Sequence, residues 1–438
     1  MRNIFITIAC FFSLFVTAQT AEELSVTFIK KLERQKFDSC YAMLDTVVTN
    51  KISSGMLEQM WGSMPRYMGE YKGFSDITTE EKDSILLTYV LCSFEKMKIN
   101  LQFAYHNPPS KIIGFFFTPP KNKTVYSAPD YVQPHKFYET KLAVKTGTMS
   151  LPGALCIPNH TKNPPVVLLL AGSGPNDKDE TIGPNKPLKD IATGLASLGI
   201  ATFRYDKRTL VYGKELSANY EKVGLFEEVI EDALNAIKTI RAFPDLKISP
   251  IFIAGHSLGA MCAPLIASKS KEVKGIVLLA GNARPLEDLI LEQVKYLASQ
   301  DSLSNDDIKE LDTLQQQVAR VKQPKILKNS KKEELPLGLP SYYWQSLNKY
   351  HQVEVAKKLK QPVLVVQGER DYQVTMKDFE LWKQALGDKP KNKFMSYPDL
   401  NHLLLPGKEK SWPQEYQIQG NVSQKLITDM ADWIKSQK

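Results

Sequence analysis

The segment around Ser257 has the residue types and spacing of a nucleophilic serine. Gly255-His256-Ser257-Leu258-Gly259 follows the apolar residues 251–254 and precedes the small-residue stretch "AMCAPLIA". A G-x-S-x-G between a buried strand and a helix holds its serine on a sharp turn, where the glycines let the two backbones pass closely. A glycine-rich turn that contains a serine by chance is the alternative. Because the flanking strand and helix are both indicated, the pattern predicts that Ser257 is a nucleophile.

A serine hydroxyl needs a base to take its proton, so a histidine must lie within reach of Ser257. His402 is in "YPDLNHLLLPG", on a loop after the last predicted strand that can reach the serine turn. The other five histidines lie in the N-terminal region, a linker, a hairpin, the serine motif itself and a helical insertion: His106, His135, His160, His256 and His351. By elimination and position, His402 is the predicted base.

An acidic residue must orient that base and stabilise its imidazolium form. The stretch "QPVLVVQGERDYQVT" ends a predicted strand with two acids, Glu369 and Asp371. We assign the role to Asp371, and Glu369 is the runner-up, which we expect to form a salt bridge or face solvent. Ser257, Asp371 and His402 then each follow a strand, and the three together are more specific than any one of them.

Backbone N–H groups must also stabilise the oxyanion that forms when the serine attacks a carbonyl. One donor is expected from Leu258, directly after the nucleophile. The other is expected from Ser173, in the glycine-rich loop Ala171-Gly172-Ser173-Gly174 that follows "VVLLL". A phosphate-binding loop is the alternative, but no G-x-x-x-x-G-K-[ST] can be written there.

The elements that position these residues alternate between apolar strands and helices. From residue 136 a hairpin leads into six apolar stretches, separated by helical ones: "VVLLLAG", "GIATFRYD", "PIFIAGHS", "KGIVLLAG", "QPVLVVQGE" and "KFMSYPD". Continuously apolar strands are typical of a parallel sheet buried on both faces. The fold class is therefore α/β with a doubly wound, mostly parallel sheet. Such sheets bind ligands at the carboxyl ends of their strands, where the predicted residues lie.

Three further segments accompany this sheet. A helical insertion at about 283–355 is predicted to be a cap, and its aromatic residues Tyr342, Tyr343 and Trp344 could line a substrate pocket or pack in a core. Residues 22–119 show helical periodicity and then strand-like runs, which predicts a small α+β domain of unknown role. The polar, proline-containing residues 120–135 read as a linker, which leaves 136–438 as the α/β domain.

The first residues predict export. "MRNIFITIACFFSLFVTAQT" has an early positive charge, an apolar run and then small residues, as a signal peptide spanning 1–18 would. A retained N-terminal anchor is the alternative, but the run is shorter than the about 20 apolar residues of a membrane span. We expect a periplasmic or secreted protein without stable membrane insertion. After cleavage Cys40 and Cys92 could pair, although two cysteines are weak grounds for a disulfide.

The composition excludes several other classes of protein. A formal charge of +8 is modest for 438 residues, and the basic residues do not form a stripe interleaved with aromatic residues. We therefore expect no nucleic-acid partner. There is no CxxC and no tight His/Cys/Asp cluster, so no metal is predicted, and nothing in the sequence calls for a cofactor.

The region from about residue 136 resembles the secreted bacterial α/β-hydrolases, and among these the serine-aminopeptidase-like and dienelactone-hydrolase-like carboxylesterases. The similarity lies in "AGSGPNDKDE", "FRYDKR", "AGHSLGA", "GERDYQV" and "LNHLLLPG". It implies a triad of Ser257, Asp371 and His402 with an oxyanion hole at Ser173 and Leu258. Relatives with an "HG" oxyanion motif have a histidine where this chain has Ala171. The N-terminal unit resembles nuclear-transport-factor-like α+β domains.

These observations predict a serine hydrolase that cleaves short-chain or aryl carboxylic esters through an acyl-enzyme. The substrate would be a small-molecule or acylated-glycan ester, and the oligomeric state is not predicted. A serine aminopeptidase is the first alternative; it would need an acidic group for the substrate's amine, for which Glu287, Asp288 and Glu292 are available. A non-catalytic binding protein with a vestigial hydrolase fold is the second. Asp206 and Arg208, in "YDKR", are expected to fix a loop.

Overall fold

A computed structural model describes residues 19–95, 97–118, 126–217, 220–299 and 305–437. The chain divides into two compact units, Met1–Lys123 and Thr124–Lys438, which are described separately. The predicted signal peptide, 1–18, lies outside the described residues. Within them, no helix has the length and apolar character needed to cross a bilayer.

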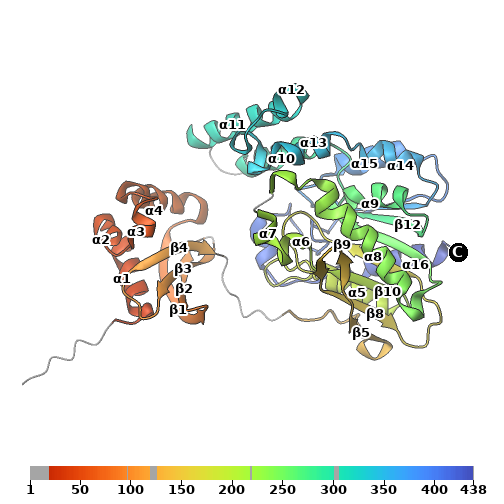
Figure 1. The fold of residues 1–438 in the computed structure, drawn as a ribbon, viewed down its shortest axis with the longest axis horizontal. Helices are drawn as coiled ribbons and strands as arrows, with labels where there is room; N and C mark the ends of the chain where they lie inside the picture. Colours follow the sequence, from red (N-terminus) through yellow and green to blue (C-terminus); the bar gives the residue numbers. More distant parts are fainter. Residues whose placement is uncertain (1–18, 96, 119–125, 218–219, 300–304, 438) are drawn as a thin grey trace, which may run out of the picture. The chain divides into compact units, whose positions relative to one another are not determined.

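In its described residues, the smaller unit has four helices followed by a four-stranded antiparallel sheet (Figure 1). The elements are α1 (Ala21–Glu33), α2 (Phe37–Tyr41), α3 (Thr46–Thr49), α4 (Ser54–Met68), β1 (Tyr71–Lys82), β2 (Ile85–Phe94), β3 (Lys98–His106) and β4 (Ile112–Thr118). A capping box of Thr20 and Glu23 begins α1, whose residues Phe28 and Ile29 are fully buried in the unit's core. The predicted α+β class of this unit is confirmed. Cys40 and Cys92 are both buried as free thiols.

The larger unit is built on an eight-stranded sheet in the order β14-β13-β12-β11-β9-β10-β8-β5. Its strands are β5 (Phe137–Lys141), β8 (Gly153–Pro158), β9 (Val166–Leu170), β10 (Ala201–Tyr205), β11 (Ile251–His256), β12 (Val273–Leu279), β13 (Val363–Gly368) and β14 (Lys393–Tyr397), beside a small hairpin of β6 (Val144–Thr146) and β7 (Met149–Leu151). The strands from β14 to β10 are parallel, and only β8 and β5 pair in the antiparallel sense. The predicted doubly wound, mostly parallel sheet is confirmed.

Helices cover both faces of this sheet because its central strands are apolar on both sides. In β9, Leu168 belongs to one core while Val167 and Leu169 belong to the other. The first core includes α8 (Glu231–Ala242), α9 (Leu258–Lys269) and α15 (Met376–Leu386), and the second includes α5 (Pro187–Ser197) and α16 (Gln424–Ser436). The short helices α6 (Arg208–Val211) and α7 (Gly213–Ser217) follow β10.

A helical insertion separates β12 from β13, where the cap was predicted at about 283–355, and its last helix extends to Lys358. It contains α10 (Leu286–Ala298), α11 (Asn305–Val321), α12 (Pro324–Leu327), α13 (Ser341–Asn348) and α14 (Gln352–Lys358). Figure 1 shows α10–α13 together on one side of the larger unit, away from β5 and β8. This insertion brings side chains over the sheet edge at which the predicted site residues lie.

The segment predicted as a linker contributes side chains to the larger unit. Tyr126 Oη donates a hydrogen bond to Asp190 at 2.7 Å, and Tyr131 Oη donates one to the carbonyl of Val422 at 2.8 Å.

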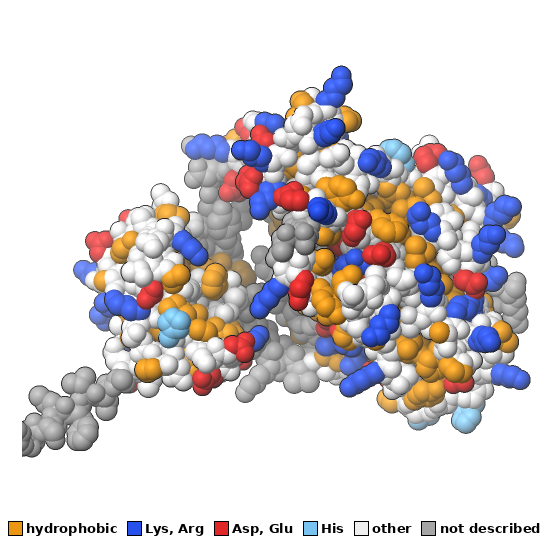
Figure 2. Space-filling model, viewed as in Figure 1, with side chains coloured by type: hydrophobic (Ala, Val, Ile, Leu, Met, Phe, Trp, Pro, Cys, Tyr) orange, Lys and Arg blue, Asp and Glu red, His pale blue; other side chains and the backbone are white. Residues whose placement is uncertain are grey.

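Lys and Arg side chains on the face in Figure 2 are scattered among acidic and uncharged ones. That face therefore has no continuous basic stripe.

Candidate active site

Ser257 occupies a strained turn between β11 and α9. Its φ of 52° and ψ of −114° lie in a region that non-glycine residues rarely adopt. A Cβ on Gly255 would lie 2.2 Å from the Gly259 carbonyl, and one on Gly259 would lie 2.5 Å from the carbonyl oxygen of Leu170. Both glycines of G-x-S-x-G are thus required by close backbone contacts. Strain of this kind costs about 1–3 kcal/mol and is characteristic of functional sites.

Asp371 and His402 are in direct contact, as the sequence predicted. Asp371 Oδ2 lies 2.7 Å from His402 Nδ1, and both side chains are buried. The other oxygen, Oδ1, accepts the backbone N–H groups of Gln373 and Val374 at 2.7 and 3.0 Å. Gln367 Nε2 also donates to Oδ2, at 3.1 Å. The carboxylate is therefore held in one orientation toward the imidazole.

The runner-up, Glu369, is not part of this contact. Its Oε1 accepts a hydrogen bond from the hydroxyl of Ser396 at 2.8 Å, in an exposed position. Of the two acids that follow β13, the structure brings only Asp371 to His402.

His402 lies close to the serine turn. The residue before the serine, His256, has its Nε2 2.8 Å from the His402 carbonyl oxygen, and the two imidazole rings are 4.8 Å apart. Among the described residues, the structure records no hydrogen bond between Ser257 Oγ and the His402 ring. Such bonds are often long or poorly aligned before a substrate binds.

The two predicted oxyanion donors border the same cavity as the serine. Ser173, Ser257 and Leu258 all line a cavity of about 590 Å³. The loop after β9 lies against the serine turn, because a Cβ on Gly172 would be 3.3 Å from the Cβ of Ser257. Glycine at 172 is what allows this close approach.

A buried pair that the sequence analysis did not predict, Glu180 and His256, supports both loops. Glu180 Oε1 accepts the N–H of Gly172 at 2.6 Å and lies 2.9 Å from His256 Nδ1. Burial alone would lower the pKa of His256, but the charge of Glu180, its hydrogen bond and the His402 carbonyl together raise that pKa. His256 was identified only as a motif residue, and Glu180 only as the last letter of "AGSGPNDKDE".

The raised pKa predicts that the contribution of His256 to stability depends on pH. We expect the variant His256→Gln to lower the free energy of unfolding by about 3 kcal/mol at pH 6, because Glu180 loses its buried partner. The proton on His256 stabilises the fold fully below its unfolded pKa of about 6.5, and this contribution is lost as pH rises through the folded pKa. Urea unfolding of both proteins at pH 6, 7.5 and 9 measures the difference. A difference that stays constant over this range would contradict the prediction.

The cavity walls are largely apolar, and most of their apolar side chains come from the cap. Helix α10 contributes one face with helical spacing: Leu286, Leu289, Ile290, Gln293, Val294 and Leu297. Of the three aromatic residues predicted to line a pocket, only Tyr343 does so. Tyr342 is 45% exposed, and Trp344 is fully buried in the hydrophobic core, so the prediction was wrong for these two. Helical rotation explains this, because consecutive helix residues point in different directions.

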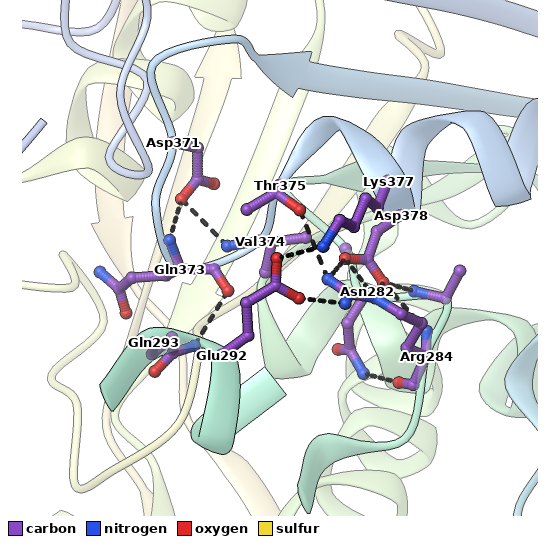
Figure 3. Close-up of polar contacts among 12 residues, drawn as sticks. Asn282, Arg284, Glu292, Gln293, Asp371, Gln373, Val374, Thr375, Lys377 and Asp378 are labelled. Atoms are coloured by element: carbon purple, nitrogen blue, oxygen red, sulfur yellow. Dashed lines mark hydrogen bonds and ion pairs between the residues drawn. The ribbon is translucent and has the colours of Figure 1, made fainter. Parts of the chain in front are cut away.

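The cap helix α10 is attached to α15 by a charged cluster and to the Asp371 loop by a hydrogen bond (Figure 3). Arg284 pairs with Asp378 at 2.7 Å and also with Glu292, which in turn pairs with Lys377 at 2.9 Å. Gln293 Nε2 donates to the carbonyl of Gln373 at 3.0 Å. The same helix therefore forms the cavity wall and contacts the loop that carries Asp371.

None of the three acids considered for amine binding lines the cavity at Ser257. Glu292 is engaged in the cluster just described, and Asp288 pairs with Lys322. Glu287 and Asp288 line a different cavity, next to Tyr350 and His351.

The expected role of the "YDKR" charges is confirmed: Asp206 accepts the backbone N–H of Lys178 at 2.7 Å, and Arg208 pairs with Asp232 at 2.6 Å.

A doubly wound sheet with a strained serine turn at the end of β11, an inserted cap and an Asp–His contact at the same edge defines an α/β hydrolase. The comparisons specify the family. Residues 186–410 match the family described as serine aminopeptidase, S33, and residues 25–115 match a family of unknown function, DUF3887. The chain belongs to the serine aminopeptidase S33 family.

The chain is similar to one esterase over nearly its whole length and has the fold of several solved hydrolase structures in part. Esterase EstD from Thermotoga maritima is 37% identical over 415 residues, which is 93% of this chain and 93% of that protein. The solved structure of Est1E from Butyrivibrio proteoclasticus shares 16% identity, covers 68% of this chain and 98% of its own, and has a TM-score of 0.44. A dienelactone hydrolase from Anabaena variabilis shares 15% identity, covers 69% of this chain and 99% of its own, and has a TM-score of 0.40.

The recognised resemblance is confirmed, and the protein is an esterase-like hydrolytic enzyme. The alternative of a non-catalytic binding protein is therefore wrong.

Proposed function

We propose that this protein is an exported carboxylesterase in which Ser257, His402 and Asp371 form a catalytic triad. The observation that carries the proposal is the hydrogen bond between Asp371 and His402, formed beside a strained serine turn that borders an apolar cavity. The identity of 37% to esterase EstD over nearly the whole chain supports ester hydrolysis. The leader at 1–18 supports export to the periplasm or the medium.

The proposed reaction proceeds through an acyl-enzyme. His402 Nε2 takes the proton of Ser257 Oγ as the oxygen attacks the ester carbonyl, and Asp371 stabilises the imidazolium that forms. The N–H groups of Ser173 and Leu258 stabilise the oxyanion. The tetrahedral intermediate collapses, the C–O bond to the alcohol breaks and His402 protonates the leaving oxygen. Water then repeats the sequence on the acyl-serine, which releases the acid and restores the hydroxyl.

The charges around the cavity favour esters over peptides with a free amino terminus. An aminopeptidase needs an uncompensated carboxylate for the substrate's ammonium group. The one acidic side chain among the described cavity-lining residues is Glu228, and it already pairs with Lys207 at 2.6 Å. The apolar face of α10 instead suits the uncharged acyl or aryl group of an ester.

Comparing chromogenic esters with anilides tests this proposal. The mature protein, purified from the exported fraction and with its N-terminus sequenced, is assayed on p-nitrophenyl acetate, butyrate and benzoate and on amino-acid p-nitroanilides. We expect kcat/KM to be at least about 100-fold higher for the best ester, since the cavity offers no partner for the ammonium group. Faster turnover of the anilides would favour the aminopeptidase. An N-terminus at residue 1 would contradict cleavage of the leader.

A further inference from the structure

The peptide unit between Gly172 and Ser173 is held by an unusual donor. The carbonyl oxygen of Gly172 accepts a hydrogen bond from Lys207 Nζ at 2.9 Å, and Asn176 Nδ2 also donates to it at 3.2 Å. The preceding N–H, that of Gly172 itself, donates to Glu180 at 2.6 Å. Residue 172 is therefore fixed by a cation on its carbonyl and by a carboxylate on its N–H. The N–H of Ser173 belongs to the same peptide unit as that carbonyl.

Lys207 is a buried cation whose other partners are also buried. Its side chain follows β10 and is 5% exposed as a residue, while Glu228 is 8% exposed. The two groups are 2.6 Å apart, and the second oxygen of Glu228 accepts the hydroxyl of Tyr343 at 2.7 Å. Taking two charges out of water is costly, and a well-packed apolar pair would often be as stable. The pair is thus better explained by what its ammonium group does than by stability.

The geometry of a peptide unit connects Lys207 to the cavity. A trans peptide is planar, so a cation that fixes the carbonyl oxygen on one side also fixes the direction of the N–H on the other. A positive charge on the carbonyl polarises the amide and strengthens the hydrogen bond that its N–H donates. Ser173 borders the same cavity as Ser257, where the proposed oxyanion forms.

We propose that Lys207 is a positioning residue for catalysis, which orients and polarises the Gly172–Ser173 peptide so that the Ser173 N–H stabilises the oxyanion. This inference rests on the proposed esterase mechanism. Glu228 and Tyr343 hold the ammonium group in place. Tyr343 lies on the cap helix α13, so a chain of hydrogen bonds connects the cap to the oxyanion loop, residues 171–174. It passes from Tyr343 to Glu228, from Glu228 to Lys207 and from Lys207 to Gly172.

The variant Lys207→Met tests the inference, with Arg208→Met as its matched control. Arg208 is the next residue and is equally buried, but within the described part of the chain its hydrogen bonds go to Asp232 and Glu231 and none goes to residues 171–174. For Lys207→Met we expect kcat to fall by about 10- to 100-fold, somewhat less than the loss of a whole oxyanion donor, with KM changed less than about twofold. The affinity for a trifluoromethyl ketone, which mimics the tetrahedral oxyanion, should fall by the same factor. Arg208→Met should lower the melting temperature but keep kcat and this affinity.

Several outcomes would overturn the inference. The first is that Lys207→Met leaves kcat and the ketone affinity unchanged. The second is that Lys207→Met and Arg208→Met lose both to the same extent, which would indicate a structural role for Lys207. If Lys207→Met does not fold, Tyr343→Phe decides, because it removes only the hydroxyl that holds Glu228; we expect a smaller loss of kcat and ketone affinity in the same ratio, and no change would refute the inference. Ser257→Ala is assayed in parallel. Activity in that variant would refute the esterase mechanism itself, whereas an inactive Ser257→Ala beside a fully active Lys207→Met would refute only the role of Lys207.

Discussion

Replacing Ser257 by alanine is expected to lower kcat for p-nitrophenyl esters by roughly 10⁶-fold, because the proposed acyl-enzyme could no longer form. The hydroxyl is the only group removed. Alanine also relieves none of the turn's strain, since its φ preference resembles that of serine, so the variant should fold normally. Steady-state rates on the ester panel and circular dichroism spectra measure the two effects.

The loss of kcat should be specific to Ser257, and replacing the proposed base His402 should cause a loss of similar size. His402→Ala alone and the double variant should lose about as much as Ser257→Ala, because residues that act as a unit are not additive. Ser268→Ala is a matched control, since Ser268 is exposed on α9 and its hydroxyl donates a hydrogen bond to the carbonyl of Leu265, in the preceding turn of the same helix. A fluorophosphonate probe should label the wild type and Ser268→Ala but not Ser257→Ala. Labelling of Ser257→Ala would show that the nucleophile had been assigned wrongly.

The sheet could be predicted from the sequence because its strands have one strong signal. Strands such as β9 and β11 are buried on both faces, so nearly every residue is apolar and the run is easily recognised. Strand β1 of the smaller unit has no such signal, for the opposite reason. Its residues Tyr71–Lys82 are mostly exposed or half-buried and include several charges, so neither alternation nor an apolar run marks it.

The candidate site was predictable where the signal is local to a strand end, and less so where it depends on contacts across the fold. Asp371 and His402 each follow a strand of a parallel sheet, and topology alone brings such positions to one edge. Glu180, His256 and Lys207 act through contacts with residues that lie 21 to 146 positions away in the chain. A charged residue in a loop usually faces solvent, so the sequence offers no sign that these are buried.

The cap illustrates a different limit. Its aromatic cluster was predicted to line the pocket because of its residue types. Trp344 instead belongs to the hydrophobic core, and the aliphatic face of α10 forms much of the cavity wall. The spacing of Leu286, Leu289, Ile290 and Val294 is that of an ordinary amphipathic helix. Periodicity shows that such a face is covered, but whether a core or a cavity lies beneath it depends on packing.

Replacing Asp371 by asparagine is expected to lower kcat by about 10⁴-fold with little effect on folding, because it puts the wrong tautomer of His402 in the site. Asp371 Oδ1 accepts two backbone N–H groups, so the amide oxygen of an asparagine must take that position. Its NH₂ group then points at His402 Nδ1 and can only donate. The imidazole proton moves to Nε2, which can no longer accept the proton of Ser257.

Glu369→Gln is the matched control for this prediction, because it makes the same chemical change at the other acid after β13. Glu369 is exposed and, among the described residues, accepts a hydrogen bond from Ser396 alone, so kcat should stay within about twofold. Full activity in Asp371→Asn together with a large loss in Glu369→Gln would reverse the assignment of the two acids. Losses of similar size in both variants would mean that contact with His402, which Asp371 makes and Glu369 does not, fails to identify the catalytic acid.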